Sequence, residues 1–466
     1  MFLNQFQTSL LRWVFFNNYM QKTTNFPTLS DSAFLRYFNF SALYFAEGLA
    51  QGMLFVGIPA WMAMQGKSPS EIGKFAVACS VPWTFKFVVA PLMDRYTYLP
   101  MGRKRPWVLL GHLGLMLSII AFAFVPDPLN NLNTFFAAAF LVSSFGAIQD
   151  AAGDAMAVDV VPPNQQARAN GYMQGSRMVG SSLALVLCSW ILNKYSFEAS
   201  MLTLFLLVAL ITIVPVVLRE QRGEKILPFT SGEASETSQK LQISNWAVIL
   251  KALYNVFKLR NSLLVVILLF ITQGAYNFFE TLLPIFAVKI TGWTNVLYSQ
   301  VFATADLIGG IIGMLVGGYL IERFGKKRMI NIYFLLIMAL ILALNFAGNY
   351  WQNTNMLYGF IITYRLVNAF AKIGVFAIAM QCCSKNISAS QFTIFMTMGA
   401  MGSIAGAFLV GPIKENFNWN ITFIFFEAFI GLAWLVLQFV NIEKHRAKIA
   451  ELEYESTKNL VDSDYE

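Results

Sequence analysis

The sequence predicts an all-α membrane protein with twelve transmembrane helices arranged in two six-helix bundles. Apolar residues make up 57% of the 466 residues and only 12% are charged, whereas an ordinary soluble domain is about 25% charged. Twelve long apolar runs follow one another, with a hydrophilic stretch between the sixth and the seventh. This composition argues against a water-soluble enzyme and against a nucleic-acid-binding protein, although the net charge is +8.

Each apolar run is long enough to be a membrane-spanning helix. A helix needs about 20 residues to cross the hydrocarbon core. Backbone groups in lipid must form their hydrogen bonds within the segment, which favours helices over open strands. The predicted spans are 34–63, 71–93, 106–125, 133–160, 169–193, 199–218, 262–290, 298–321, 329–347, 355–381, 390–412 and 420–441.

The spans divide the chain into five parts. We expect an N-terminal cytoplasmic segment (1–33), a first bundle (34–218), a cytoplasmic linker (219–261), a second bundle (262–442) and a cytoplasmic tail (443–466). The first segment has no basic leader of the kind that opens a secretory signal peptide. Apolar residues recur there at helical spacing, so both a short helix on the membrane surface and an extension without regular structure are consistent with it.

The distribution of positive charge predicts the orientation. With both termini inside, 24 Lys and Arg residues lie on the cytoplasmic side and 5 lie outside. Cytoplasmic loops carry an excess of Lys and Arg, so the split indicates a multi-pass protein with both termini in the cytoplasm. The same asymmetry explains the basic net charge, because these residues face anionic lipid headgroups.

No cofactor or metal is expected. The four cysteines lie inside apolar runs without metal-ligand spacing, and the two histidines, His112 and His445, lie at a helix start and in the tail. A Walker-type phosphate loop is absent from the sequence, which argues against transport driven by ATP.

Two segments of the chain echo each other, one in each half. Residues 90–95 are followed by the basic stretch 102–105, and residues 318–323 by the basic stretch 325–328. Each segment places a carboxylate at a helix end beside a short basic loop, and transporter halves are often internal repeats. A carboxylate–cation pair here can brace the closed cytoplasmic side. The predicted gating residues are Asp94, Arg95, Arg103, Glu322, Arg323 and Lys326.

The second of these segments, residues 318–328, resembles the loop signature of the major facilitator superfamily. Other segments resemble the bacterial muropeptide permeases, which belong with the acetyl-coenzyme A transporters in one branch of that superfamily: 84–87, 90–97, 102–107, 149–154 and 159–162. The resemblance to the superfamily covers 34–441, and that to the branch about 82–162. It implies the major facilitator fold, secondary active transport by alternating access, a bacterial inner membrane location and a monomer.

Two departures from the muropeptide permeases concern the solute. Many of those permeases carry extra helices, for which this chain has no apolar segment left. They also have an arginine early in the fifth helix, whereas here Gly171 and Tyr172 are followed by Met173 and the nearest arginine is Arg177. The solute is therefore open between a muropeptide-type sugar-peptide and a siderophore, a sugar or a drug. An intramembrane enzyme is a distant alternative.

The resemblance implies that the first, fourth, seventh and tenth helices line a central cavity, and polar residues gather on these four helices. An ionisable residue inside a span costs about 3 kcal/mol on insertion scales and is usually functional. Cationic side chains suit an anionic solute, because an arginine can grip a carboxylate with two hydrogen bonds. The predicted solute-binding residues are Gln51, Asp150, Gln273, Asn277, Arg365, Asn368 and Lys372.

Protons are the expected coupling ion, because a buried carboxyl favours its protonated form and can load and unload a proton. The candidates are Glu47, Asp150 and Glu280. Glu47 is the first choice, since no Lys or Arg lies within one helical turn of it. Matching depths in the fourth and fifth helices predict a structural ion pair between Asp154 and Arg177. Asp306 is isolated and is expected to serve helix packing.

Two series of glycines predict close contacts between helices. Gly171 and Gly175 lie four residues apart, and Gly309, Gly313 and Gly317 repeat the same spacing. Small residues at this spacing allow helices in a membrane to approach closely.

Overall fold

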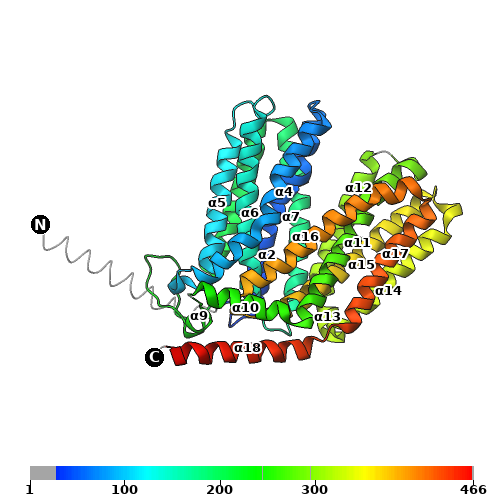
Figure 1. Cartoon of the computed structure of the whole chain (residues 1–466). Helices are drawn as coiled ribbons and strands as arrows, with labels where there is room; N and C mark the ends of the chain where they lie inside the picture. Colours follow the sequence, from blue (N-terminus) through cyan, green and yellow to red (C-terminus); the bar gives the residue numbers. More distant parts are fainter. Residues whose placement is uncertain (1–27, 244, 294, 464–466) are drawn as a thin grey trace, which may run out of the picture.

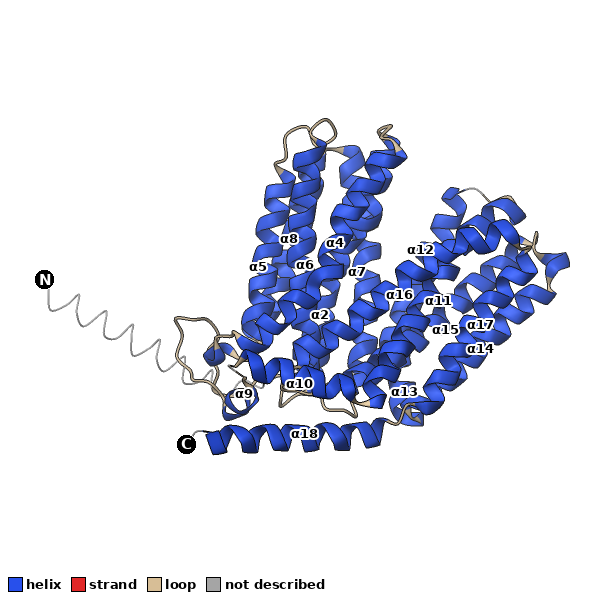
Figure 2. Cartoon of the chain, in the orientation of Figure 1, coloured by secondary structure: helices blue, strands red, loops and turns tan. Residues whose placement is uncertain are grey.

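The computed structural model describes residues 28–243, 245–293 and 295–463. Within these residues, twelve helices are long and apolar enough to cross a membrane. Each coincides with one predicted span to within about one helical turn. The surface helix considered for the N-terminal segment lies almost entirely outside the described residues. Among those residues, Figure 2 shows helices joined by loops and turns.

The first six spans form one bundle and the last six form another. The first bundle consists of α2 (Ala33–Gly52), a π-helical turn (Met53–Gly57) and α3 (Ile58–Met64) as one span, then α4 (Pro69–Arg95), α5 (Arg105–Ala123), α6 (Leu132–Val160), α7 (Gln166–Lys194) and α8 (Phe197–Val217). The second consists of α11 (Arg260–Thr291), α12 (Asn295–Ile312), a π-helical turn (Gly313–Gly317) and α13 (Gly318–Phe324) as one span, then α14 (Lys326–Phe346), α15 (Thr354–Gln381), α16 (Ser388–Asn416) and α17 (Trp419–Phe439).

Local sequence explains several helix ends. Ser68 accepts a hydrogen bond from the backbone of Glu71, whose carboxylate accepts one from the backbone of Ser68, so a capping box starts α4. Gly292 ends α11 with a φ of 69°. Gly325 turns the chain between α13 and α14 with a φ of 92°. Glycine adopts such positive φ angles without steric strain.

The linker and the tail contain helices of their own. Two short helices, α9 (Glu236–Leu241) and α10 (Trp246–Lys258), lie between the bundles in the sequence, and α18 (Ile442–Ser463) follows the last span. Figure 1 shows α9, α10 and α18 gathered at one end of the molecule. We call this end the linker face.

The bundles share a core near the linker face and separate towards the opposite end. One cluster of buried apolar side chains joins both bundles, from Met93, Met156 and Met173 in the first to Phe370 and Phe392 in the second. The other large cluster belongs to the first bundle alone. In Figure 1 the bundles accordingly meet at the linker face and diverge at the far end.

Gly171 and Gly175 of the first predicted series face Gly313 of the second series and its neighbour Gly310 across the boundary between the bundles, whereas Gly309 and Gly317 face α15. A Cβ atom at Gly175 of α7 would lie 2.4 Å from the carbonyl oxygen of Gly310, and one at Gly171 would lie 3.1 Å from that of Gly313. Any larger residue at Gly175 would therefore collide with backbone. The two bundles touch here through their main chains, in the manner of small-residue helix contacts in membranes.

Candidate functional site

A cavity of about 330 Å³ lies between the two bundles. Side chains from α2, α4, α6 and α7 line one side, and side chains from α11, α15 and α16 line the other. Four of the predicted solute-binding residues contribute to the wall: Gln51, Asp150, Gln273 and Lys372. Asn368 lines a smaller neighbouring pocket together with Gln273 and Lys372.

The first bundle contributes a buried charge cluster to this cavity. The guanidinium of Arg177 lies 3.0 Å from a carboxylate oxygen of Glu47 and 3.0 Å from one of Asp150. The ammonium group of Lys86 lies 2.5 Å from the other oxygen of Asp150. The Glu47 side chain is 1% exposed and that of Asp150 4%. Gln51 donates to Glu47 at 2.8 Å.

The structure corrects two expectations about this cluster. Arg177 pairs with Glu47 and Asp150 rather than with Asp154, which accepts a hydrogen bond from the Tyr44 hydroxyl. The prediction compared backbone depths only. An arginine side chain is long enough to reach a residue one helical turn, about 5.4 Å, further along the neighbouring helix. Glu47 is also not remote from positive charge, because its partner comes from α7 and not from its own helix.

The second bundle holds its own charge cluster. Arg365 on α15 lies 2.5 Å from Glu280 on α11 and also pairs with Asp306 on α12. Its guanidinium donates to the Tyr276 hydroxyl at 3.1 Å. Asp306 is therefore not isolated, which corrects that expectation. Asn277 donates to the backbone oxygen of Ser403.

Arg365 and Asn277 thus contact groups of the protein itself, and neither is among the residues that line the main cavity. Their interactions hold α11, α12, α15 and α16 together. This placement suits a structural role better than the predicted contact with solute.

Lys372 differs from the other buried cations. It lies in the cavity wall, and among the described residues no carboxylate oxygen comes within 4.0 Å of its ammonium group. Its ammonium group lies over two aromatic rings, 5.1 Å from the centre of the Tyr276 ring and 5.7 Å from that of Phe376. A cation in a poorly hydrated wall without a counter-ion has unused capacity to bind an anion.

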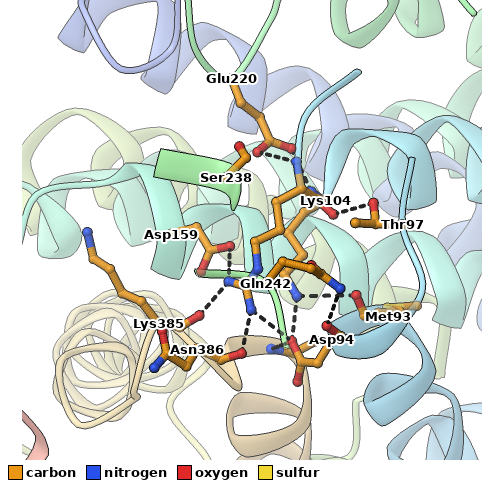
Figure 3. A network of polar contacts seen from close by, with 12 residues as sticks. Met93, Asp94, Thr97, Lys104, Asp159, Glu220, Ser238, Gln242, Lys385 and Asn386 are labelled. Carbon is orange, nitrogen blue, oxygen red and sulfur yellow. Dashed lines mark hydrogen bonds and ion pairs between the residues drawn. The ribbon is translucent and has the colours of Figure 1, made fainter. Parts of the chain in front are cut away.

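The first predicted gate forms between the bundles at the linker face (Figure 3). Asp94 at the end of α4 lies 2.5 Å from Lys104 and 3.7 Å from Arg103. Its carboxylate also accepts hydrogen bonds from the backbone of Ala389 and Ser390 in the first turn of α16. Arg103 pairs with Asp159 at 2.8 Å and donates to the backbone oxygens of Lys385 and Asn386.

The second predicted gate occupies the equivalent place in the other half. Glu322 at the end of α13 pairs with the Arg168 guanidinium at 2.9 Å and accepts a hydrogen bond from the Arg168 backbone at 2.8 Å. Lys326 donates to the backbone oxygen of Pro163 at 2.6 Å. Each gate therefore sets a carboxylate of one bundle against the start of a helix in the other, where the helix dipole favours negative charge.

Two of the predicted gating residues lie outside these contacts. The Arg95 guanidinium stacks on the rings of Tyr96 and Trp246, 4.9 Å and 4.8 Å from their centres. Arg323 lies over the ring of Phe324. Neither is paired with a carboxylate in the described part of the chain. In the first half, the cations that pair with Asp94 are Arg103 and Lys104 of the basic loop, not Arg95, the next residue in the chain.

Several residues of the site were not identified from the sequence. Lys86, a charge well inside the second span, was not assigned to the site, and it lines the cavity together with Trp83 and Gln174. Tyr44 could have been found, because it lies three residues before Glu47 on the same helical face. Glu220 accepts hydrogen bonds from the backbone of Arg103, Lys104 and Arg105, and no local pattern indicated that contact.

Within the described residues, no group of three or more His, Cys, Asp or Glu side chains is placed to hold a metal ion. The chemistry of the cavity is that of paired and unpaired charges with aromatic faces between them. Such a site can bind a polar molecule and exchange protons.

Comparisons with known proteins agree on one family. The family model described as "Major Facilitator Superfamily" matches residues 40–407 and, in a second match, 300–456. The Escherichia coli K12 protein named anhydromuropeptide permease is 26% identical over 410 residues, covering 85% of this chain and 78% of the relative. A putative transporter AmpG 1 of Rickettsia conorii is 23% identical over 389 residues, covering 78% and 88%.

Solved structures show the same fold at low sequence identity. The transporter FucP in its outward conformation superposes with a TM-score of 0.64 at 15% identity, covering 87% of this chain and 98% of FucP. The human organic anion transporter MFSD10 gives 0.63 at 13% identity, covering 86% and 98%.

Proposed function

The chain belongs to the Major Facilitator Superfamily of secondary transporters, and from that premise we propose that it carries a polar or anionic solute, of the muropeptide sugar-peptide type, coupled to protons. The observation that carries the proposal is Lys372, a cation in the wall of the central cavity without a carboxylate partner among the described residues. The carboxylates of a sugar-peptide supply the anion that it lacks. The name of the Escherichia coli relative, anhydromuropeptide permease, supports this solute class.

The shape and lining of the cavity are compatible with such a solute. Ligand pockets combine apolar and aromatic walls with a few placed polar groups. Here Trp83, Phe55 and Phe376 supply flat apolar surfaces, and Gln51 and Gln273 supply amide groups, all in the lining of the cavity. Asp150 is committed to Lys86 and Arg177, so we assign it a supporting role rather than direct solute contact.

Proton coupling is supported by the charge balance of the first-bundle cluster. Glu47, Asp150 and Asp154 are three acids, whereas the cations that contact this group are two, Lys86 and Arg177, bound to Glu47 and Asp150. With every group ionised the cluster carries one uncompensated negative charge in a region of low dielectric, which is costly. One exchangeable proton balances it.

Two carboxyls of this cluster are the sites to test. Glu47 is 1% exposed and shares its single cation, Arg177, with Asp150. Asp154 is 5% exposed and has a hydroxyl rather than a cation as its partner. The second-bundle cluster has the same excess, with Glu280 and Asp306 around Arg365, so Glu280 is kept as a third candidate.

We infer that the linker face lies in the cytoplasm, because it carries most of the Lys and Arg residues. The gates close that face, and the bundles diverge at the other end (Figure 1). With this orientation the structure represents an outward-facing state, and the solute enters from outside. A bacterial inner membrane and a monomeric carrier complete the proposal.

The test is uptake into proteoliposomes containing the purified protein, with an imposed pH gradient. Labelled anhydro-muropeptide should accumulate when the outside is acidic, and collapse of the gradient should stop accumulation. A siderophore, a sugar or a drug that accumulates in its place would overturn the solute class. A sodium gradient that drives full uptake at equal pH would overturn the coupling ion.

Variants separate the proton site from the solute site. Glu47→Gln and Asp154→Asn should each be assayed for uphill uptake and for exchange of internal for external solute without a gradient. The proton carrier is the residue whose change abolishes uphill uptake and preserves exchange. Glu198→Gln, at an exposed site in the first turn of α8, is the matched control and should leave both activities intact.

A further inference from the structure

A second cavity, of about 430 Å³, lies on the linker face. It is bounded by the end of α10, the start of α11, the end of α17 and the start of α18. Four basic residues line it, Lys258 and Arg260 on one side and Lys444 and Lys448 on the other, and no lining residue is acidic. None of them belongs to the central cavity or to the gates.

The positive charge of this cavity is uncompensated in the described part of the chain. Among the described residues, none of these four side chains forms an ion pair, since no carboxylate oxygen lies within 4.0 Å of its charged group. The first turns of α11 and α18 also border the cavity, at Arg260 and Lys444. The start of a helix carries partial positive charge that suits an anion, and α11 has no side-chain cap there.

A buried histidine in the wall has an unused ring nitrogen. His445 is 1% exposed and lines the cavity. Its Nε2 lies 3.0 Å from the backbone oxygen of Cys382, which can only accept, so Nε2 carries a proton. Its Nδ1 is buried and has no hydrogen-bond partner among the described residues. Buried polar atoms are rarely left without a partner, so this nitrogen is an unsatisfied polar group in the wall of the cavity.

The cavity lies at the depth of lipid headgroups. The span of α11 starts at Arg260 and the span of α17 ends at Phe439, and both residues line the cavity. Phe439 is 55% exposed. The adjacent helix α10 buries Ile249 and Val256 but exposes Leu250 and Tyr254, as a helix lying in the membrane interface does.

We propose that this cavity, the basic pocket of the linker face, binds the phosphate of an anionic phospholipid headgroup. Lys258, Arg260, Lys444 and Lys448 surround the phosphate, and the acyl chains run along Phe439 into the membrane. An apolar wall that continues from the basic one favours a lipid over a free phosphate ion, which has no use for it. Basic pockets between membrane helices bind such headgroups in other proteins.

The test measures the thermal midpoint of purified protein in a neutral detergent as phosphatidylglycerol is added. Binding to the folded state should raise the midpoint progressively, with the logarithm of the lipid concentration once the site is mostly filled, whereas phosphatidylcholine should have little effect. The variant Lys258→Gln with Lys444→Gln should need roughly 30-fold more phosphatidylglycerol for the same rise, because each basic residue near an anionic headgroup contributes about fivefold in affinity.

A matched control separates this pocket from general surface charge. Lys251→Gln with Arg446→Gln removes two exposed charges from the same two helices, α10 and α18, outside the cavity. This variant should respond to the lipid like the unmodified protein, and an equal loss in both variants would overturn the proposal. So would equal stabilisation by phosphatidylcholine.

A second arm distinguishes the source of the phosphate. If millimolar inorganic phosphate alone reproduces the rise and competes with phosphatidylglycerol, the pocket binds a soluble phosphate and the lipid assignment is overturned. Native mass spectrometry of the unmodified protein provides an independent reading that needs no variant. It should show phosphatidylglycerol retained in preference to phosphatidylcholine, and no preference would contradict the proposal.

Discussion

Asp94 in the first bundle accepts two hydrogen bonds from Ser390 in the second, one from its backbone N–H at 2.8 Å and one from its hydroxyl at 2.6 Å. Both side chains are completely buried. The same carboxylate pairs with Lys104 at 2.5 Å, so a single buried group joins a basic loop to a helix start across the boundary between bundles. We regard this contact as the main lock of the linker face.

Asp94→Asn should open the linker face. The change leaves Lys104 and Arg103 without their carboxylate, and breaking one side of a buried ion pair costs about 3–5 kcal/mol. Spin labels at Asn164 and Arg328, exposed sites in the two bundles, should show a longer distance in the variant. Labelling is selective because the four native cysteines are buried.

Arg95→Gln is the control for this experiment. Arg95 is the next residue in the chain, but it stacks on Trp246 and takes no part in the lock. The distance between the labels should stay at its unmodified value. A variant at Asp94 that leaves the distance unchanged would contradict the assignment of the lock.

A double-mutant cycle tests the partners of Arg177. Arg177→Gln should lower the thermal midpoint, because Glu47 then loses its cation while Asp150 keeps only Lys86. Adding Glu47→Gln should recover part of the loss, with an interaction energy of about 1–3 kcal/mol. Adding Asp154→Asn should recover little, since Asp154 is bonded to Tyr44 instead. If Asp154→Asn recovers more stability than Glu47→Gln, Arg177 pairs with Asp154, as the helix depths predicted.

The sequence predicted the spans well, because burial in lipid imposes a long apolar run on each helix. It also identified the carboxylates of both gates, Asp94 and Glu322, because the two halves repeat the same pattern. The positions of Gln51, Asp150 and Lys372 in the cavity wall followed from the cost of placing polar groups in a membrane. These inferences need only one helix at a time.

The partners of these residues could not be predicted in the same way. Whether Arg177 reaches Asp150 or Asp154 depends on how α6 and α7 are rotated and on Tyr44, which belongs to α2. Asp306 looked isolated because its partner Arg365 comes from another helix of the second bundle. The docking of α18 on the linker face was also not foreseen, since its hydrophilic sequence resembles that of a solvent-exposed tail.

Stability should depend on pH through Glu224 in the linker. Burial, and then the neighbouring Glu220, raise the pKa of this carboxyl to about 8. In the unfolded chain the carboxyl ionises near its ordinary pKa of about 4.3, so between these values the folded protein holds a proton that the unfolded chain has lost. The free energy of unfolding should therefore fall as the pH rises from about 4.5 to about 8, by a few kcal/mol.

Glu224→Gln should remove this dependence. The amide oxygen can keep accepting from the backbone of Gln221, and the amide NH2 group can donate to the Ser238 hydroxyl at the other position, but the side chain does not titrate. Thermal midpoints measured across this pH range should be flatter for the variant than for the unmodified protein. Glu236→Gln, whose side chain is 89% exposed in the same linker, should leave the original slope, and an unchanged slope in Glu224→Gln would contradict the prediction.

Lys372→Met should separate stability from solute binding. Removing a buried cation that lacks a carboxylate partner relieves a desolvation cost, so the thermal midpoint should be unchanged or higher. Solute binding should weaken by about 2 kcal/mol or more, roughly 30-fold, because an anionic group of the solute loses its partner. Titration calorimetry with the solute identified by the uptake assay measures the loss, and Lys372→Arg should restore part of the affinity.

Arg365→Met provides the contrast, because it removes a cation that does have partners. Glu280 and Asp306 then lose the cation between them. The thermal midpoint of this variant should therefore be lower than that of the unmodified protein and of Lys372→Met. If Lys372→Met binds the solute normally, this lysine does not hold the anionic group. If it unfolds as easily as Arg365→Met, Lys372 serves the packing of the bundle, and the cavity must bind its solute through other residues.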